Sequence, residues 1–186
     1  TGDSLDQALK NAENFALKLN DISHSPYFLP YMSGERTPHN DPYVRGSFHY
    51  LKTITNKAAL QYAVLEGISF GILDCVNSIQ SIHKNFDDIF MVGGGSRSFF
   101  WLKLLSSIIN RKLFVCEQSE FGAALGVSRL AMFVDNNISN KNTIIKEINI
   151  KKSFYPDNEK INIFEKRYNV WKNIYSSNTK ISASFL

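Results

Sequence analysis

Hydrophobic residues recur at intervals of three and four along several stretches of the chain, and this spacing predicts amphipathic helices. The first covers residues 4–19, where Ser4 followed by Gln7 has the form of a capping box. The second covers residues 56–83 and is the longest helical pattern. A last helix is predicted after Pro156 by the spacing of its large side chains, Ile163, Phe164, Tyr168, Trp171 and Tyr175.

Between residues 88 and 134, short apolar runs alternate with helical patterns. Residues 88–92 and 113–116 read as apolar strands, and residues 98–109 and 121–134 as apolar helices. A strand–helix–strand–helix order with buried strands is typical of a parallel sheet crossed by helices. The sequence therefore predicts an α/β fold.

The remaining segments are less regular. Residues 27–31 and 46–51 favour short extended segments, and residues 33–45 form a polar loop that contains two prolines. We expect a main lobe over residues 1–135. Residues 136–186 would then form a polar connector, up to about residue 152, and an aromatic helix that packs on the lobe.

Two glycines interrupt the long helix. Gly67 and Gly71 lie one turn apart, and each costs about 1 kcal/mol relative to Ala in a helix interior. Close approach of a neighbouring element is the explanation that we favour. Glu66 lies beside Gly67 in the apolar pattern, either as a buried, paired carboxylate or at the edge of the apolar face.

Composition narrows the class of protein. Of the 186 residues 44% are hydrophobic and 20% charged, which is close to the globular average and predicts a buried core. The two cysteines, Cys75 and Cys116, cannot form a disulfide framework, which favours a reducing cytoplasm. No apolar run approaches the roughly 18–20 residues of a membrane span, so we expect no membrane partner. The first residue is Thr1, which suggests a piece of a longer chain.

The net charge of +4 comes from the tail. Residues 1–135 carry 12 Lys or Arg and 13 Asp or Glu, whereas residues 136–186 carry 9 and 4. Nucleic-acid binding would require basic residues clustered on one face with aromatic residues between them. We therefore expect no nucleic-acid partner.

The segment Val92–Ser98, with the sequence VGGGSRS, lies between a predicted strand and a predicted helix. Its three glycines let backbone amides approach a ligand closely, and the helix N-terminus behind them favours an anion. The spacing matches neither a P-loop nor the dinucleotide fingerprint, because no Gly-Lys-Ser/Thr follows and Ser98 replaces the last glycine. A phosphate- or ribose-binding loop and a tight turn without a ligand both remain open.

Two further segments carry candidate chemistry. Residues 119–126 (SEFGAALG) open the next helix with small residues, which allow close approach to the glycine loop or to a flat base, or serve helix packing. Residues 33–39 place charges in a loop, where they have a functional role or form a local Glu35–Arg36 pair.

Catalytic and metal-binding residues do not stand out. The four histidines lack metal-ligand spacing, and no nucleophile–base pair is evident. Spacing selects no general base among the carboxylates Asp41, Asp74, Asp87 and Asp88. We therefore assign no catalytic residue and no metal ligand, and expect half of a site whose other half lies elsewhere.

Five segments together resemble the FGGY family of carbohydrate kinases. Residues 28–39 (FLPYMSGERTPH) resemble a loop of its xylulose kinase branch. Residues 46–48 and 63–67 resemble the C-terminal signature of the family. Residues 89–98 resemble its nucleotide-binding loop, and residues 121–126 the helix start that follows. The match covers most of the chain in the family's order.

The resemblance implies an actin- and hexokinase-like ATPase fold with two ribonuclease-H-like lobes and ATP between them. This chain would be the later part of the C-terminal lobe, incomplete at its N-terminal side, with a C-terminal helix. The implied activity is transfer of the γ-phosphoryl group of ATP, with Mg²⁺, to a sugar hydroxyl. D-xylulose is the first candidate substrate, and glycerol, gluconate and ribulose are alternatives. A non-catalytic nucleotide-binding or assembly module is the alternative from another class.

The resemblance also implies which residues bind the nucleotide: Gly93, Gly94, Gly95, Ser96, Arg97 and Gly122. Arg97 would lie along the nucleotide or face solvent. The catalytic aspartate of the family has no matching position here, so we expect it upstream, together with the sugar site and the N-terminal lobe. The isolated chain should then lack kinase activity, and its uncovered sheet edge and apolar helix face favour aggregation or a homodimer.

Two positions depart from the family's pattern. Tyr50 replaces a residue that is usually Gly, which concerns the turn after the predicted strand. Ala59 replaces a polar or acidic residue, and we expect this change to alter only a surface contact.

Overall fold

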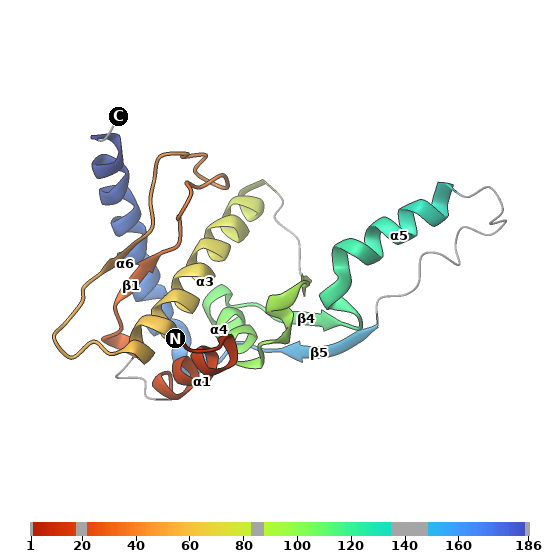
Figure 1. Ribbon diagram of the computed structural model, residues 1–186, viewed down its shortest axis with the longest axis horizontal. Coiled ribbons are helices and arrows are strands. Elements are labelled where there is room, and N and C mark those ends of the chain that lie inside the picture. The colour runs from red at the N-terminus through yellow and green to blue at the C-terminus, as the bar shows by residue number, and fades with distance from the viewer. Residues whose placement is uncertain (1, 18–21, 83–87, 135–148, 185–186) are drawn as a thin grey trace.

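The computed structural model describes residues 2–17, 22–82, 88–134 and 149–184 (Figure 1). The elements follow the order α1 Leu5–Phe15, β1 Tyr27–Leu29, β2 Ser47–His49, α3 Lys57–Ile82, β3 Ile89–Met91, the 3₁₀ turn η1 Gly94–Arg97, α4 Phe99–Ile109, β4 Leu113–Cys116, the 3₁₀ turn η2 Ser119–Phe121, α5 Gly122–Val134, β5 Ile150–Phe154 and α6 Asn158–Ala183. Helices and strands alternate as expected, and the predicted α/β class is confirmed.

Helix α1 begins as its sequence predicts but uses only half of the expected capping box. The Ser4 hydroxyl accepts a hydrogen bond from the backbone N–H of Gln7 at 3.2 Å. The Gln7 amide does not reach back and instead donates to Asn11 at 2.9 Å. The predicted end of this helix at residue 19 lies outside the described residues, and α1 itself ends at Phe15.

A three-stranded sheet has the order β3–β4–β5. Strands β3 and β4 are parallel, with Ile89 opposite Leu113, as the alternating pattern predicts. Strand β5 runs antiparallel to β4, with Phe154 opposite Leu113. The expectation of a polar connector up to residue 152 is therefore wrong at its end. Residues 150–152 are exposed on an edge strand, where lysines are common.

A small antiparallel pair, β1 and β2, lies next to α3. Phe28 faces Phe48 across this pair, with ring centroids 4.7 Å apart. The turn after β2 places Tyr50 at φ +61°, in the left-handed region that favours glycine. This conformation explains physically why a glycine suits the position. Ala59 is buried, with 4% of its surface exposed, so the expectation that its replacement alters a surface contact is wrong.

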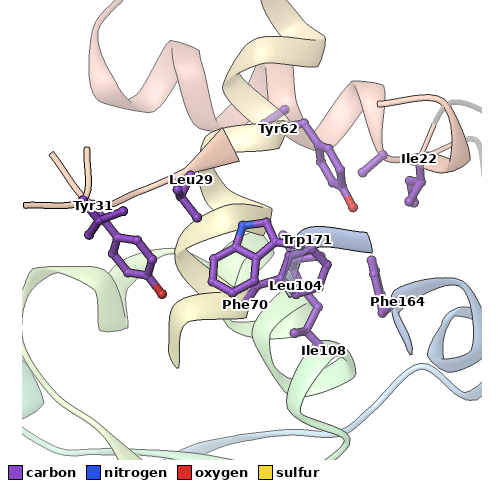
Figure 2. Close-up of a cluster of buried hydrophobic side chains, with 12 residues drawn as sticks. Ile22, Leu29, Tyr31, Tyr62, Phe70, Leu104, Ile108, Phe164 and Trp171 are labelled. Atoms are coloured by element: carbon purple, nitrogen blue, oxygen red, sulfur yellow. The ribbon is translucent and has the colours of Figure 1, made fainter. Parts of the chain in front are cut away.

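The main hydrophobic core joins α1, α3, α4 and α6. Figure 2 shows Trp171 of α6 at the centre of this cluster, among Leu29, Phe70 and Leu104. The Trp171 indole Nε1 donates a hydrogen bond to the carbonyl of Phe28 at 2.9 Å. The aromatic helix after Pro156 therefore packs against α3, α4 and β1, as its pattern predicts. A second cluster, which includes Leu102, Leu105 and Val115, lies against the sheet.

Gly67 meets the close approach that the sequence predicts. A Cβ atom at Gly67 would lie 2.1 Å from the carbonyl oxygen of Phe28, so only glycine fits. A Cβ atom at Gly71 would have Pro30 as its nearest neighbour at 3.7 Å, which is ordinary contact. The close approach therefore explains Gly67 but does not require Gly71.

Helix α3 is also long and apolar enough to cross a membrane by length and composition. Half of its most apolar 18-residue window is buried inside the fold. Glu66 and Asp74 of this helix are buried as well. Its apolar character thus serves the core of this lobe.

Candidate functional site

The glycine loop follows directly from the end of β3. Gly93 adopts φ +84°, which non-glycine residues rarely do, and η1 continues from Gly94 to Arg97. The Ser96 hydroxyl donates a hydrogen bond to the carbonyl of Gly93 at 2.7 Å. Ser98 then caps α4 by accepting a hydrogen bond from the N–H of Trp101. The loop is thus held as a tight turn with a capped helix behind it.

The two small-residue segments that the sequence singles out meet in space. The backbone N–H of Gly93 donates to the carbonyl of Ser119 at 2.8 Å. The hydroxyls of Ser96 and Ser119 lie 3.1 Å apart, and both serines are buried. The loop after β3 and the turn after β4 are therefore joined by hydrogen bonds at the carboxyl ends of two parallel strands. Ligands bind at this edge in open α/β sheets.

The predicted nucleotide-binding glycines do not all have the same role. Added Cβ atoms at Gly93 and Gly94 would meet nothing within 4 Å, so the backbone there faces open space. An added Cβ at Gly95 would lie 2.3 Å from Cζ3 of Trp101, and one at Gly122 would lie 3.2 Å from Cβ of Val92. Packing therefore explains Gly95 and Gly122, while Gly93 and Gly94 offer the bare backbone that a ligand could approach.

A cavity of about 300 Å³ lies beside the loop. It is lined by residues of η1, the start of α4, the end of β4, η2 and β5, among them Ser96, Phe99, Ser119 and Lys152. Small-molecule sites have volumes from about 300 Å³ upward. The cavity therefore has room for a small ligand next to Ser96 and Arg97 of the loop, while the openness of the loop backbone itself rests on Gly93 and Gly94.

Arg97 lines this cavity but points largely to solvent. Its side chain is 71% exposed, and Nε lies 3.0 Å from a carboxylate oxygen of Glu120. Exposed pairs of this kind contribute little to stability. Glu120 partly neutralises the guanidinium beside the loop.

A second polar cluster orders the loop at residues 33–45. The His39 ring Nε2 lies 3.2 Å from Asp74 of α3 and stacks on Tyr175 of α6, with centroids 3.9 Å apart. The backbone N–H of His39 donates to Glu35 at 2.8 Å. Tyr168 also donates to Asp74. Of the two explanations for this loop, local ordering has structural support, but through His39 rather than through a Glu35–Arg36 pair.

Burial explains the pKa directions in this cluster. It raises the pKa of Tyr175 to about 12, and the carboxylates of Asp41, Glu35 and Asp74 act in the same direction. The pKa of Tyr168 is raised by burial and by its hydrogen bond to Asp74. Both phenols are therefore neutral near pH 7, and the cluster holds the loop without forming a nucleophile.

Glu66 and Arg167 form a buried ion pair, and the sequence suggested only one of its two members, Glu66. Arg167 Nη2 and Nε lie 2.6 and 2.7 Å from the two Glu66 oxygens, in a two-pronged contact. Of the alternatives for Glu66, the buried and paired carboxylate is correct. Arg167 lies 101 residues away on a helix whose pattern shows only aromatic periodicity, so spacing gave no signal for it.

The two cysteines are half-buried rather than core residues. Burial raises the pKa of both thiols, so neither is an activated nucleophile. Among the described residues, no group of three His, Cys, Asp or Glu side chains could hold a metal ion. The chemistry that this site can perform is therefore recognition of a ligand by backbone amides, hydroxyls and cationic side chains.

Comparison with known proteins gives these features a context. A model of the "FGGY family of carbohydrate kinases, C-terminal domain" matches residues 3–134. A xylulose kinase of Staphylococcus epidermidis is 31% identical over 160 residues, which cover 86% of this chain and 32% of the relative. A xylulose kinase of Escherichia coli is 30% identical over 149 residues, which cover 80% and 31%. The chain thus spans about a third of the length of these relatives.

Solved structures share the fold. A "xyloylose kinase" from Brucella ovis is 30% identical with a TM-score of 0.74, over 96% of this chain and 39% of that one. Ligand-bound xylulose kinase from Lactobacillus acidophilus is 25% identical with a TM-score of 0.79, over 99% and 36%. Glycerol kinase from Plasmodium falciparum with ADP, at 22% identity and a TM-score of 0.69 over 95% and 34%, shows the fold alone.

Proposed function

The chain belongs to the FGGY family of carbohydrate kinases, and we propose that it forms the nucleotide-binding part of a kinase that transfers the γ-phosphoryl group of ATP to a sugar hydroxyl. The observation that carries this proposal is the bare backbone at Gly93 and Gly94, which faces open space at the carboxyl end of β3. The capped N-terminus of α4 lies behind it and favours a phosphate group.

The proposed nucleotide contacts are those of the loop and of the turn that it touches. The backbone N–H groups of Gly94 and Gly95 hold the phosphate end, and Ser96 lies beside the nucleoside. Gly93 provides the sharp turn, Gly122 keeps α5 close to Val92, and Arg97 remains at the rim. Phosphoryl transfer depends mainly on positioning and on stabilisation of charge, so such contacts are a suitable contribution from one lobe.

ATP and Mg²⁺ are the proposed cofactors. Mg²⁺ usually binds through one or two carboxylates together with substrate phosphates, rather than in an all-protein site. The described residues offer a backbone loop for the nucleotide. The same described residues contain no cluster of side chains that could hold Mg²⁺. We assign no Mg²⁺ ligand and no catalytic base to this chain, and propose that both come from the N-terminal lobe and the start of this lobe.

D-xylulose is the proposed substrate, and a role in xylulose metabolism follows from it. The relatives named above as xylulose kinases support this choice. The loop at residues 33–39, which resembles that branch, supports it too. The alternatives remain another sugar or polyol of the same family, because the chain carries no assigned sugar contact. Two free cysteines agree with the reducing cytoplasm that we propose as its location.

The proposed partner is the remainder of the kinase. Helix α5 projects from the helical body and buries none of its residues (Figure 1). Its Val127, Leu130 and Val134 are 67%, 66% and 78% exposed. Among the described strands β3 pairs only with β4, so one edge of the sheet is open. We propose that further strands of the kinase pair with this edge and cover the apolar residues. A second copy of the chain is the alternative, and sedimentation velocity would detect such a dimer.

Calorimetric titration of the chain with ADP tests the proposal. We expect binding to the wild-type chain and loss of binding in Gly94→Val, because the added side chain extends into the open space over the loop, where a Cβ atom meets nothing within 4 Å. Gly2→Val is the matched control, since Gly2 also has nothing within 4 Å. Equal ADP binding by wild type and Gly94→Val would refute the site. We also expect no xylulose phosphorylation by the isolated chain, and measurable turnover would refute that assignment of roles.

A further inference from the structure

Strand β5 contributes side chains to the cavity beside the glycine loop. Lys151, Lys152 and Phe154 line it, although β5 covers residues 150–154 and the family model matches only residues 3–134. The proximity arises from pairing, since β5 lies antiparallel to β4 with Lys152 opposite Val115. A segment outside the matched region therefore builds one wall of the candidate nucleotide site.

This wall is an ordered arrangement of two rings and a cation. Phe99, at the start of α4, is 58% exposed, and its ring packs edge-on against the buried Phe154 at a centroid distance of 5.0 Å. Lys152 Nζ lies 4.8 Å from the centroid of the Phe99 ring. A cation over an aromatic face is held in place by electrostatic attraction. This contact places the ammonium group beside the cavity that Lys152 lines, although the residue remains exposed.

The charge of Lys152 has no acidic partner in the described part of the chain. The cavity's acidic residue Glu120 is paired with Arg97 at 3.0 Å. No carboxylate of the described residues lies within ion-pair distance of Lys152. An ammonium group has three N–H donors, and the aromatic ring contacts it from one side only, so N–H groups on the other side are left without an acceptor among the described residues. The cavity therefore presents unused donors to a ligand that carries hydrogen-bond acceptors.

We propose that Lys152 contacts the base of the nucleotide, donating a hydrogen bond to a ring nitrogen such as N7 of a purine. The inference rests on the proposed function. If the backbone N–H groups of Gly94 and Gly95 hold the phosphates, we place the nucleoside in the adjoining cavity, which Ser96 and Phe99 line. Purine N7 is an acceptor, which suits an ammonium donor. β5 thereby adds a base contact that the loop glycines do not provide.

The test measures binding of ADP and of inorganic pyrophosphate to wild type, Lys152→Met and Lys166→Met. Methionine keeps much of the apolar stem but removes the donors. Lys166 is an exposed lysine on α6 outside the cavity, so it controls for a change in net charge. We expect ADP binding to weaken roughly tenfold in Lys152→Met, the effect of one charge-assisted hydrogen bond. Pyrophosphate binding should remain unchanged, and Lys166→Met should bind both ligands as the wild type does.

Other outcomes overturn the assignment. Unchanged ADP binding in Lys152→Met removes the contact, and an equal loss for ADP and pyrophosphate moves it from the base to the phosphates. If Gly94→Val abolishes ADP binding while Lys152→Met does not, the proposed function stands and only the role of Lys152 fails. If the wild-type chain binds no ADP, both fail.

Discussion

Replacing Arg167 by Met removes the partner of a buried carboxylate, and we expect a loss of about 3–5 kcal/mol in the free energy of unfolding. The side chains of Arg167 and Glu66 are only 4% and 1% exposed. Water therefore cannot solvate the Glu66 carboxylate once the guanidinium is gone. Its remaining side-chain donor would be the hydroxyl of Tyr62, at 3.3 Å.

Further contacts of Arg167 set the magnitude. Its Nη2 donates to the carbonyls of Ser25 and Pro26 at 3.2 and 3.3 Å, and its guanidinium lies 4.2 Å from the ring centroid of Tyr27. One side chain thus joins α6, α3 and the segment before β1. Loss of these contacts adds to the cost of the unpaired charge, which places the effect well above the 0–1 kcal/mol of an exposed pair.

The direction of the pH dependence follows from the same geometry. Burial raises the pKa of Glu66, and the Arg167 guanidinium opposes that rise. Without Arg167 the folded-state pKa moves further above that of the unfolded chain. A carboxyl whose folded pKa is raised favours the folded state at low pH and loses that contribution as pH rises through the folded pKa. The cost of Arg167→Met should therefore shrink as the pH falls from neutral toward the usual range of a carboxyl group.

Urea denaturation of single and double variants measures the effect. The double variant Glu66→Leu with Arg167→Met leaves no buried charge, so we expect it to be more stable than Arg167→Met alone. Arg167→Lys keeps the charge without the two-pronged contact. Its free energy of unfolding should therefore lie between those of the wild type and Arg167→Met. Arg97→Met, which breaks an exposed pair, is the matched control. A loss below about 1 kcal/mol in Arg167→Met, or a double variant less stable than it, would refute the reasoning.

Two further predictions concern stability. Gly67→Ala should be strongly destabilising, because its Cβ would lie 2.1 Å from the Phe28 carbonyl oxygen, whereas Gly71→Ala should be neutral or stabilise by up to about 1 kcal/mol; equal effects in urea denaturation would contradict this. Burial lowers the pKa of His49 below its usual value of 6.5. The stability that neutral His49 contributes is therefore present above that pH and is lost as the pH falls through the folded-state pKa. The fall in Tm from pH 7 to pH 5 should be smaller in His49→Gln than in the wild type, and an equal fall would exclude His49 as a cause.

Local signals account for the elements that the sequence predicted correctly. Ser4 and Ser98 each stand before an apolar helical pattern, and each caps the helix that begins there. The run at residues 113–116 is apolar throughout, and β4 occupies it from end to end. The sequence also predicted a tight turn at the consecutive glycines between a strand and a helix, and Gly93 adopts the positive φ that such a turn requires, while the binding role of the loop stays a prediction.

Contacts between distant residues account for what the sequence did not reveal. The polar pair Lys151 and Lys152 led us to assign this segment to a connector. An edge strand tolerates such lysines, and the pairing of β5 with β4 became evident only in the structure. The partner of Glu66 could not be chosen from spacing, because the Arg167 guanidinium reaches it from an element near the far end of the chain. The cavity, too, takes one of its walls from β5, which is distant in sequence from the glycine loop.

These long-range contacts bear on where the folding unit ends. The family model stops at residue 134, yet Trp171 fills the centre of the main core and Arg167 neutralises a charge inside it. Removing α6 would leave Glu66 without its charged partner and uncover Phe70, so residues 3–134 alone would lack both a closed core and one wall of the cavity. The segment after residue 134 is therefore the part that completes the core and the cavity, and a test of the proposed nucleotide site requires the chain with this segment in place.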